Sequence, residues 1–123
     1  MDPRTDAIIG ACIEVHEALG PGLLESAYEA CLARELSVRE VPFSRQVCLP
    51  LEYKGLRVAR AFKADFIVRG RVVVEVKAVH QLLAVHRAQL RTYLRLTGID
   101  VGLLVNFNVT ALRDGGIRRV IPT

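Results

Sequence analysis

The sequence predicts an α/β or α+β fold in which a mixed sheet of four to five strands is flanked by helices. Three observations favour this fold. Apolar residues recur at helical spacing near the N-terminus, the middle of the chain holds a hairpin rich in Val, Ile and Phe, and a later helical segment leads into a nearly continuous apolar run. The expected order is helix, helix, three strands, helix and one strand, with or without a final strand. A right-handed helical crossover would make the third and fourth strands parallel.

Two helices are expected first. Asp2-Pro3 is typical of a helix start, with aspartate as the N-cap and proline at the first helical position. Gly20-Pro21-Gly22 ends this helix, because glycine suits a C-cap and proline cannot continue the helix. A second helix is expected from about Leu23 to Arg39, and Val41-Pro42 then ends the helical region.

The remaining elements follow from alternation and turn residues. Residues 45–53 alternate loosely and predict a strand, which Pro50 places at a sheet edge or at a bulge. Lys54-Gly55 predicts a turn, and residues 56–61 lead into the hairpin of residues 62–77. A third helix is expected over residues 82–96. Residues 100–107 then read as a strand buried on both faces, and residues 117–121 as a short edge strand.

The hairpin is centred on Gly70, and Asp65 and Glu75 are equidistant from it. A three-residue loop with this glycine in the left-handed region would place the two carboxylates opposite each other, with Cβ atoms about 5 Å apart. A two-residue turn would send them to opposite faces. The apolar pattern favours the first register, with one face formed by Phe62, Ala64, Phe66, Val68, Val72, Val74 and Val76, and the other by Asp65, Glu75, Lys77, Ile67 and Val73.

The composition predicts one globular domain over residues 1–123. Apolar residues make up 51% of the chain and charged residues 24%, which excludes a disordered chain. No apolar run reaches the ~18 residues of a membrane span, and the N-terminus lacks a signal-peptide pattern. Cys12, Cys31 and Cys48 match no zinc spacing and are expected to be buried reduced thiols of a cytoplasmic protein. The net charge of +4 is compatible with a polyanionic partner but does not by itself indicate one.

The charged face of the hairpin is a candidate metal-dependent site. Charges within a valine-rich strand pair are costly unless they are paired or bind a metal ion. Two carboxylates on neighbouring strands, Asp65 and Glu75, can hold a hard cation such as Mg²⁺, and the backbone carbonyl of Val76 could supply another oxygen. Lys77 would then orient an attacking water or stabilise the charge that develops on phosphorus during phosphodiester hydrolysis. Glu25 would add a third carboxylate if the second helix packs across this face.

The third helix carries further candidates on one side. His86, Gln89 and Tyr93 lie at helical spacing, and the last two could orient a metal-bound water or a substrate phosphate. His86 is expected to be a supporting or helix-surface residue. Tyr28, on the second helix, is expected to be a core aromatic whose hydroxyl reaches the edge of the site. A basic stripe on the third helix could contact phosphates or be a solvated face; it consists of Arg87, Arg91 and Arg95.

The charged residues also have plainer interpretations. Glu75 and Lys77 could form a solvated strand face with a weak salt bridge. Glu25 could complement the positive end of the helix dipole.

The motifs as a set resemble a known family. Asp65 followed by Glu75-Val76-Lys77, in a hairpin after an N-terminal helix, resembles the core of the PD-(D/E)XK nucleases, with Ala64 in the place of the usual proline. Residues 89–93, from Gln89 to Tyr93, resemble the Q-x-x-x-Y motif of the RecB-like branch of that superfamily. Residues 22–28 (GLLESAY) are similar to the signature of the small GxxExxY proteins.

This resemblance implies a restriction-endonuclease-like core and a nuclease that depends on Mg²⁺ or Mn²⁺. It implies that Asp65 and Glu75 are metal ligands, that Glu25 is a further ligand directly or through water, and that Lys77 is the catalytic lysine. Gln89 and Tyr93 would support the site. The expected substrate is nucleic acid, with DNA favoured over RNA, and a symmetric homodimer is the default assembly. The alternative is a module that binds nucleic acid or protein on the same fold without catalysis, whereas an oxidoreductase is disfavoured because no dinucleotide fingerprint is found.

Overall fold

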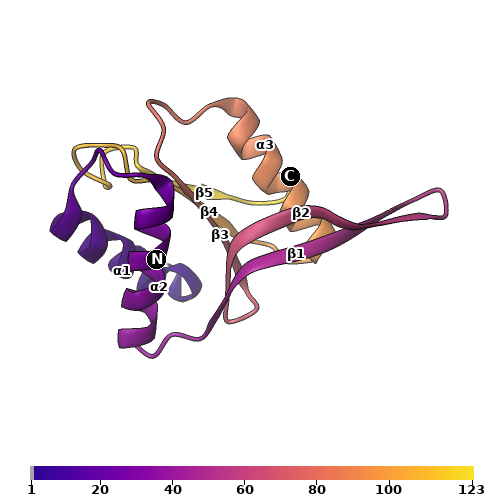
Figure 1. Ribbon diagram of the computed structural model, residues 1–123, viewed down its shortest axis with the longest axis horizontal. Coiled ribbons are helices and arrows are strands. Elements are labelled where there is room, and N and C mark those ends of the chain that lie inside the picture. Colours follow the sequence, from indigo (N-terminus) through magenta and orange to yellow (C-terminus); the bar gives the residue numbers. More distant parts are fainter. Residues whose placement is uncertain (1) are drawn as a thin grey trace.

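The computed structural model describes residues 2–123, in which three helices pack on one five-stranded sheet (Figure 1). In this part of the chain the elements are α1 (Pro3–Leu19), α2 (Glu25–Val38), β1 (Phe43–Tyr53), β2 (Leu56–Val68), β3 (Val72–Lys77), α3 (Ala84–Thr97), β4 (Gly102–Asn106) and β5 (Ile117–Val120). The strands lie in the order β1-β2-β3-β4-β5, and only β3 and β4 are parallel among the described pairs. The predicted α+β class, the mixed sheet and the order of the elements are confirmed.

The sheet separates two apolar clusters. On one face, α1 and α2 cover side chains of β2, β3 and β4 that include Phe66, Val74 and Leu103. On the other face, α3 packs on residues that include Val73 and Leu104. Figure 1 shows α1 and α2 on one side of the strands and α3 on the other. The strands β3 and β4 are therefore buried on both faces, as the apolar run at residues 100–107 predicts.

The register of the β2–β3 hairpin is also confirmed. Val68 pairs with Val72 and Phe66 with Val74, which leaves residues 69–71 as a three-residue loop. Gly70 has a φ of 65°, in the left-handed region that this loop requires.

The predicted face of two residues in β2 is wrong. Phe62 and Ala64 pack with α3 rather than with the cluster under α1 and α2. The described β2–β3 pairing ends at Phe66, and beyond it β2 pairs with β1 alone. The alternation of β2 breaks at Asp65, whose N–H bonds the Glu75 side chain, and Gln46, its neighbour on β1, has a φ of 51°. This local irregularity turns Ala64 and Phe62 toward the other face.

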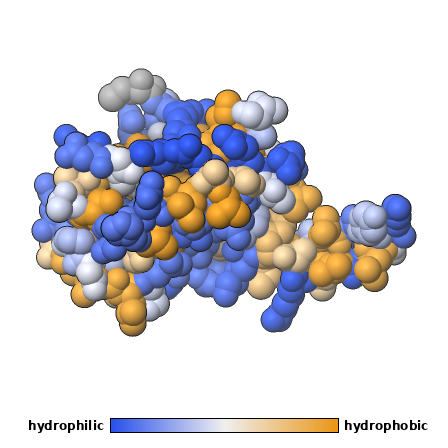
Figure 2. Space-filling model, turned by 90° about the horizontal axis from the view of Figure 1, so that it is seen from above, coloured by the Kyte–Doolittle hydropathy of each residue, from blue (hydrophilic) through white to orange (hydrophobic). Residues whose placement is uncertain are grey.

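The ribbon formed by β1 and β2 extends well beyond the body of the molecule (Figures 1 and 2). Its register shifts between Leu49 and Leu51, as Pro50 predicts, and β1 lies at the edge of the sheet. Lys54 and Gly55 form the turn at the tip, with φ angles of 48° and 85°. Positive φ at both central residues is typical of the turn that matches the twist of a hairpin.

The expectation that all three cysteines are buried is wrong for Cys48. Cys12 is buried and Cys31 is half-buried, but Cys48 is exposed, because it lies on the part of β1 that leaves the sheet. All three are free.

None of the helices within residues 2–123 has the length and apolarity needed to cross a bilayer.

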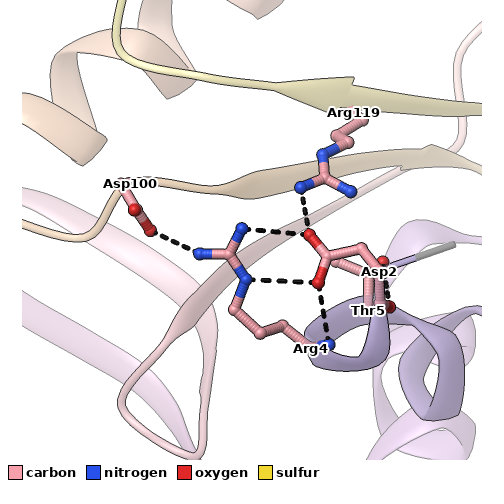
Figure 3. A network of polar contacts seen from close by, with 5 residues as sticks. All are labelled: Asp2, Arg4, Thr5, Asp100 and Arg119. Carbon is pink, nitrogen blue, oxygen red and sulfur yellow. Dashed lines mark hydrogen bonds and ion pairs between the residues drawn. The ribbon is translucent and has the colours of Figure 1, made fainter.

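A polar network ties the start of α1 to the C-terminal part of the sheet (Figure 3). Asp2 caps α1 by accepting a hydrogen bond from the Arg4 N–H at 2.9 Å, and its carboxylate also bonds the guanidinium groups of Arg4 and Arg119. Arg4 reaches Asp100 at 2.8 Å. The hydrogen bonds from Arg4 hold the pKa of Asp2 well below its usual range.

Candidate active site

The carboxylates of Asp65 and Glu75 replace a rung of the β2–β3 ladder. Past the Phe66–Val74 pair, the Asp65 N–H donates to Oε2 of Glu75 at 2.8 Å. The Val76 N–H donates to Oδ2 of Asp65, also at 2.8 Å. The two carboxylates therefore lie next to each other, as the symmetry about Gly70 predicts. Each keeps one oxygen that accepts no hydrogen bond from residues 2–123.

Burial and mutual repulsion make this pair costly as two anions. Glu75 is only 4% exposed, and burial and the charge of Asp65 raise its pKa from 4.5 to about 8. Burial also raises the pKa of Asp65, with smaller contributions in the same direction from Glu29 and Glu25. The hydrogen bond from Val76 opposes this shift. A cation bound by the two free oxygens would offset both the cost of burying the charges and the repulsion between the two carboxylates.

The metal-free protein should consequently lose stability as the pH rises. A carboxyl whose folded pKa lies above its unfolded pKa holds its proton more tightly in the native state, so stability falls between the two values. For Glu75 this window runs from 4.5 to about 8. We expect the urea midpoint in EDTA to decrease across this range, and Glu75→Gln to remove most of the decrease. A wild-type midpoint that is flat or rises over the window would contradict the repulsion.

The start of α2 contributes two carboxylates to this region. Glu25 is the first residue of α2 and is exposed, and Glu29 lies one helical turn later. Glu29 raises the pKa of Asp65 more than Glu25 does. It forms an ion pair with Arg45 at 3.7 Å and accepts a hydrogen bond from Gln46 of β1. Glu29 is not among the residues predicted from the sequence, although its four-residue spacing from Glu25 was a usable signal.

The donor set fits a hard divalent cation that retains part of its water shell. Within residues 2–123, no group of three or more His, Cys, Asp or Glu side chains converges on one point, so Glu25 does not complete a three-carboxylate set. Mg²⁺ is usually bound by one or two carboxylates together with water and substrate phosphate. Asp65 and Glu75 offer those two carboxylates. Since the Val76 N–H points toward Asp65, the carbonyl of Val76 leaves the strand on the same side and can add a further oxygen.

Lys77 lies at the end of β3, two residues beyond Glu75 and therefore on the same face of the strand. It is half-buried, and its ammonium group lowers the pKa of both Asp65 and Glu75. Its carbonyl accepts the Phe107 N–H at 2.9 Å, which fixes the strand end against the segment after β4. The structure thus brings Lys77 close to the carboxylate pair.

The residues from α3 divide into two groups. Tyr93 is buried against Phe62, with ring centroids 4.4 Å apart, and its pKa is raised by burial and by the charges of Glu75 and Asp65. It therefore lies beside the carboxylate pair. Gln89 is exposed and makes no hydrogen bond with the described residues.

The other candidates on α3 are His86, Arg87 and Arg91. Nδ1 of His86 accepts the Leu83 N–H at 2.9 Å and so completes the start of the helix. Arg87 is exposed, and Arg91 is half-buried, with an Nε that has no partner among the described residues.

Tyr28 holds the loop that precedes Glu25. Its ring stacks on Phe107 at 4.7 Å between centroids, and its hydroxyl donates to the Gly20 carbonyl at 2.6 Å. The same hydroxyl accepts the Leu23 N–H at 3.1 Å. The hydroxyl is therefore used within the α1–α2 connection, and Tyr28 positions the start of α2 rather than contacting the carboxylate pair directly.

Tyr28→Phe should destabilise the protein by about 1 kcal/mol, because the Gly20 carbonyl and the Leu23 N–H would lose a shared partner beside a buried ring. Urea unfolding measures the change. The matched control is Tyr53→Phe, whose hydroxyl lies on an exposed side chain and should matter little. Equal midpoints for Tyr28→Phe and wild type would show that the loop does not depend on this hydroxyl.

Comparison with known families gives one match. The family model described as the PD-(D/E)XK nuclease superfamily matches residues 2–120. Searches of the curated proteins and of the solved structures gave no match.

Proposed function

We propose that this chain, which belongs to the PD-(D/E)XK nuclease superfamily, is a metal-dependent nuclease that hydrolyses phosphodiester bonds in nucleic acid. The observation that carries the proposal is the geometry of Asp65 and Glu75. Each of the two adjacent carboxylates has one oxygen that accepts no hydrogen bond from the described residues, and Lys77 lies on the same face. A binding protein for a polyanion gains nothing from buried carboxylates of this kind, because they repel phosphate.

The residues have distinct roles in this proposal. Asp65 and Glu75 would hold Mg²⁺ or Mn²⁺, with the carbonyl of Val76 as a further donor. When bound, the cation would supply Lewis-acid stabilisation of the phosphoryl oxygens and lower the pKa of a bound water. Lys77 would orient the attacking water and offset the charge that develops on phosphorus.

Further residues would support these roles. Glu29 and Glu25 would complete the hydrogen bonding of water around the cation, and Tyr93 would close the α3 side of the site. Gln89 and Arg87 are exposed on the same helix, where they could contact substrate.

The test is cleavage by the purified protein. Single- and double-stranded DNA and RNA are incubated with Mg²⁺, with Mn²⁺ and with EDTA, and the products are resolved on denaturing gels. We expect cleavage of DNA that requires a divalent cation and stops in EDTA. A folded protein that cleaves no nucleic acid with either metal would overturn the proposal.

One observation favours a second candidate, a module that binds nucleic acid or protein without catalysis. No third acidic side chain among the described residues converges on the pair. Calorimetric titration with Mn²⁺ separates the two candidates. Binding of nucleic acid without any binding of Mn²⁺ would favour the second.

A further inference from the structure

The ribbon that leaves the sheet beside Asp65 forms a separate surface. We define the arm as residues 45–64, which comprise most of β1, the turn at Lys54-Gly55 and β2 up to the residue before Asp65. Residues 50–61 are exposed throughout, and Figure 2 shows this part standing away from the body of the protein. The strand that supplies Asp65 thus continues directly into the arm.

The arm carries the net charge of the protein. It contains five of the 17 basic residues but only one of the 13 acidic residues, so its net charge of +4 equals that of the whole chain. The rest of the chain is electrically balanced. The basic residues of the arm are Arg45, Lys54, Arg57, Arg60 and Lys63, and the acidic residue is Glu52. Arg57 lies 3.9 Å from Glu52 on an exposed surface, and Arg45, at the base of the arm, pairs with Glu29 of α2. Among the described residues this leaves Lys54, Arg60 and Lys63 without an acidic partner.

The dimensions of the arm match duplex DNA. A two-stranded β-ribbon fits the major groove of B-form DNA, whereas the major groove of an RNA duplex is too narrow for side chains to read. From Asp65 to Leu56 the strand spans about 30 Å at ~3.3 Å per residue. One turn of B-form DNA spans roughly 34 Å.

One face of the arm is apolar as well as exposed. Leu51 pairs with Val58 and Tyr53 with Leu56, and these four side chains are between 36% and 62% exposed. A second copy of the chain is the other occupant that such a face could take. Two arms laid together would, however, bring two net charges of +4 side by side, which opposes association. Phosphates neutralise that charge, so nucleic acid is the better match.

We propose that the arm binds duplex DNA about one helical turn away from the phosphodiester bond that is cleaved at Asp65 and Glu75. The inference rests on the proposed function for its substrate, and adds where the protein grips that substrate and why the duplex form is favoured. The basic residues would contact phosphates, and the apolar face would lie against the sugars and base edges of the groove.

The experiment measures DNA binding without cleavage. The full chain is titrated in EDTA against a fluorescein-labelled DNA duplex of about 30 base pairs, long enough to span nearly three turns. Anisotropy is recorded at several salt concentrations. The arm variant carries Lys54→Gln and Arg60→Gln. The matched control carries Arg34→Gln and Arg113→Gln, which remove two exposed arginines of the body.

We expect the arm variant to bind about tenfold more weakly at 0.1 M salt and its salt slope to fall by about 2, since each phosphate contact contributes about 0.9. The control should bind like wild type, and circular dichroism should show that both variants are folded. Equal weakening in arm variant and control, or no binding of the duplex by the wild type, would overturn the inference.

A second experiment tests whether the apolar face of the arm binds DNA or a second copy of the chain. Tyr53→Ser with Leu56→Ser should weaken DNA binding without changing the sedimentation coefficient of the free protein. A wild-type dimer that this variant splits, with DNA affinity unchanged, would assign the arm to a second copy and overturn the inference. The two proposals can fail independently. DNA binding that depends on the arm, without cleavage in Mg²⁺ or Mn²⁺, would support the arm site and contradict the nuclease proposal. Cleavage without arm-dependent binding would support the nuclease proposal and contradict the arm site.

Discussion

Asp65→Asn is expected to abolish cleavage while leaving the fold intact. The amide oxygen of asparagine can still accept the Val76 N–H, so the hydrogen bond that closes the ladder survives. The carboxylate charge that a divalent cation requires is lost. We expect cleavage to fall at least about a thousandfold and Mn²⁺ affinity to fall by about 10- to 100-fold.

The same substitution should raise the stability of the metal-free protein. The charge of Asp65 raises the pKa of Glu75, and removing that charge relieves repulsion within a buried pair. The gain in unfolding free energy should be on the order of 1 kcal/mol, the equivalent of about one pKa unit. Urea unfolding in EDTA measures it. Asp114→Asn, in an exposed turn, is the matched control and should change neither cleavage nor stability. A fully active Asp65→Asn protein would remove Asp65 from the site.

Lys77→Met should separate metal binding from catalysis. Methionine keeps most of the length of the side chain but has no charge. Because the ammonium group lowers the pKa of Asp65 and Glu75, its loss removes a positive charge that competes with a cation. We expect Mn²⁺ affinity to be unchanged or higher, while the rate of cleavage at saturating substrate falls about 100- to 1,000-fold.

The matched control for this prediction is Lys63→Met. Lys63 is exposed on β2, two residues before Asp65, so its loss can weaken DNA binding but should not change the rate at saturating substrate. Lys77→Arg tests whether charge alone suffices, since arginine retains the charge in a different geometry. Equal rates for Lys77→Met and wild type would rule out the catalytic role.

Much of the fold was predictable because its signals are local. The alternation of valines and the position of Gly70 fix the hairpin register, and that register places Asp65 opposite Glu75. Pro50 predicted the irregular edge strand, and the apolar run at residues 100–107 predicted β4, a strand buried on both faces. The PD-(D/E)XK superfamily followed from the same residues and is confirmed by the match over residues 2–120. The GxxExxY family and the RecB-like branch stay predictions.

The remaining features depend on how distant elements pack, which periodicity does not encode. The side of the sheet taken by Phe62 changes because the strand alternation breaks at Asp65, opposite Gln46 with its positive φ. The bonds of the Tyr28 hydroxyl depend on the loop before α2, and the proximity of Glu29 to Asp65 depends on how α2 docks on the sheet. The arm could be expected as a strand pair, but its projection from the body follows only from the strand lengths together.

The proposed function requires that Asp65 and Glu75 share one divalent cation. The most direct test is a crystal structure of the wild-type protein soaked in Mn²⁺, with anomalous scattering recorded near the manganese edge. We expect one anomalous peak within about 2.0–2.3 Å of the free oxygens of both carboxylates, and its absence in a matching Asp65→Asn crystal. A map from saturating Mn²⁺ with no peak between Asp65 and Glu75 would contradict the claim.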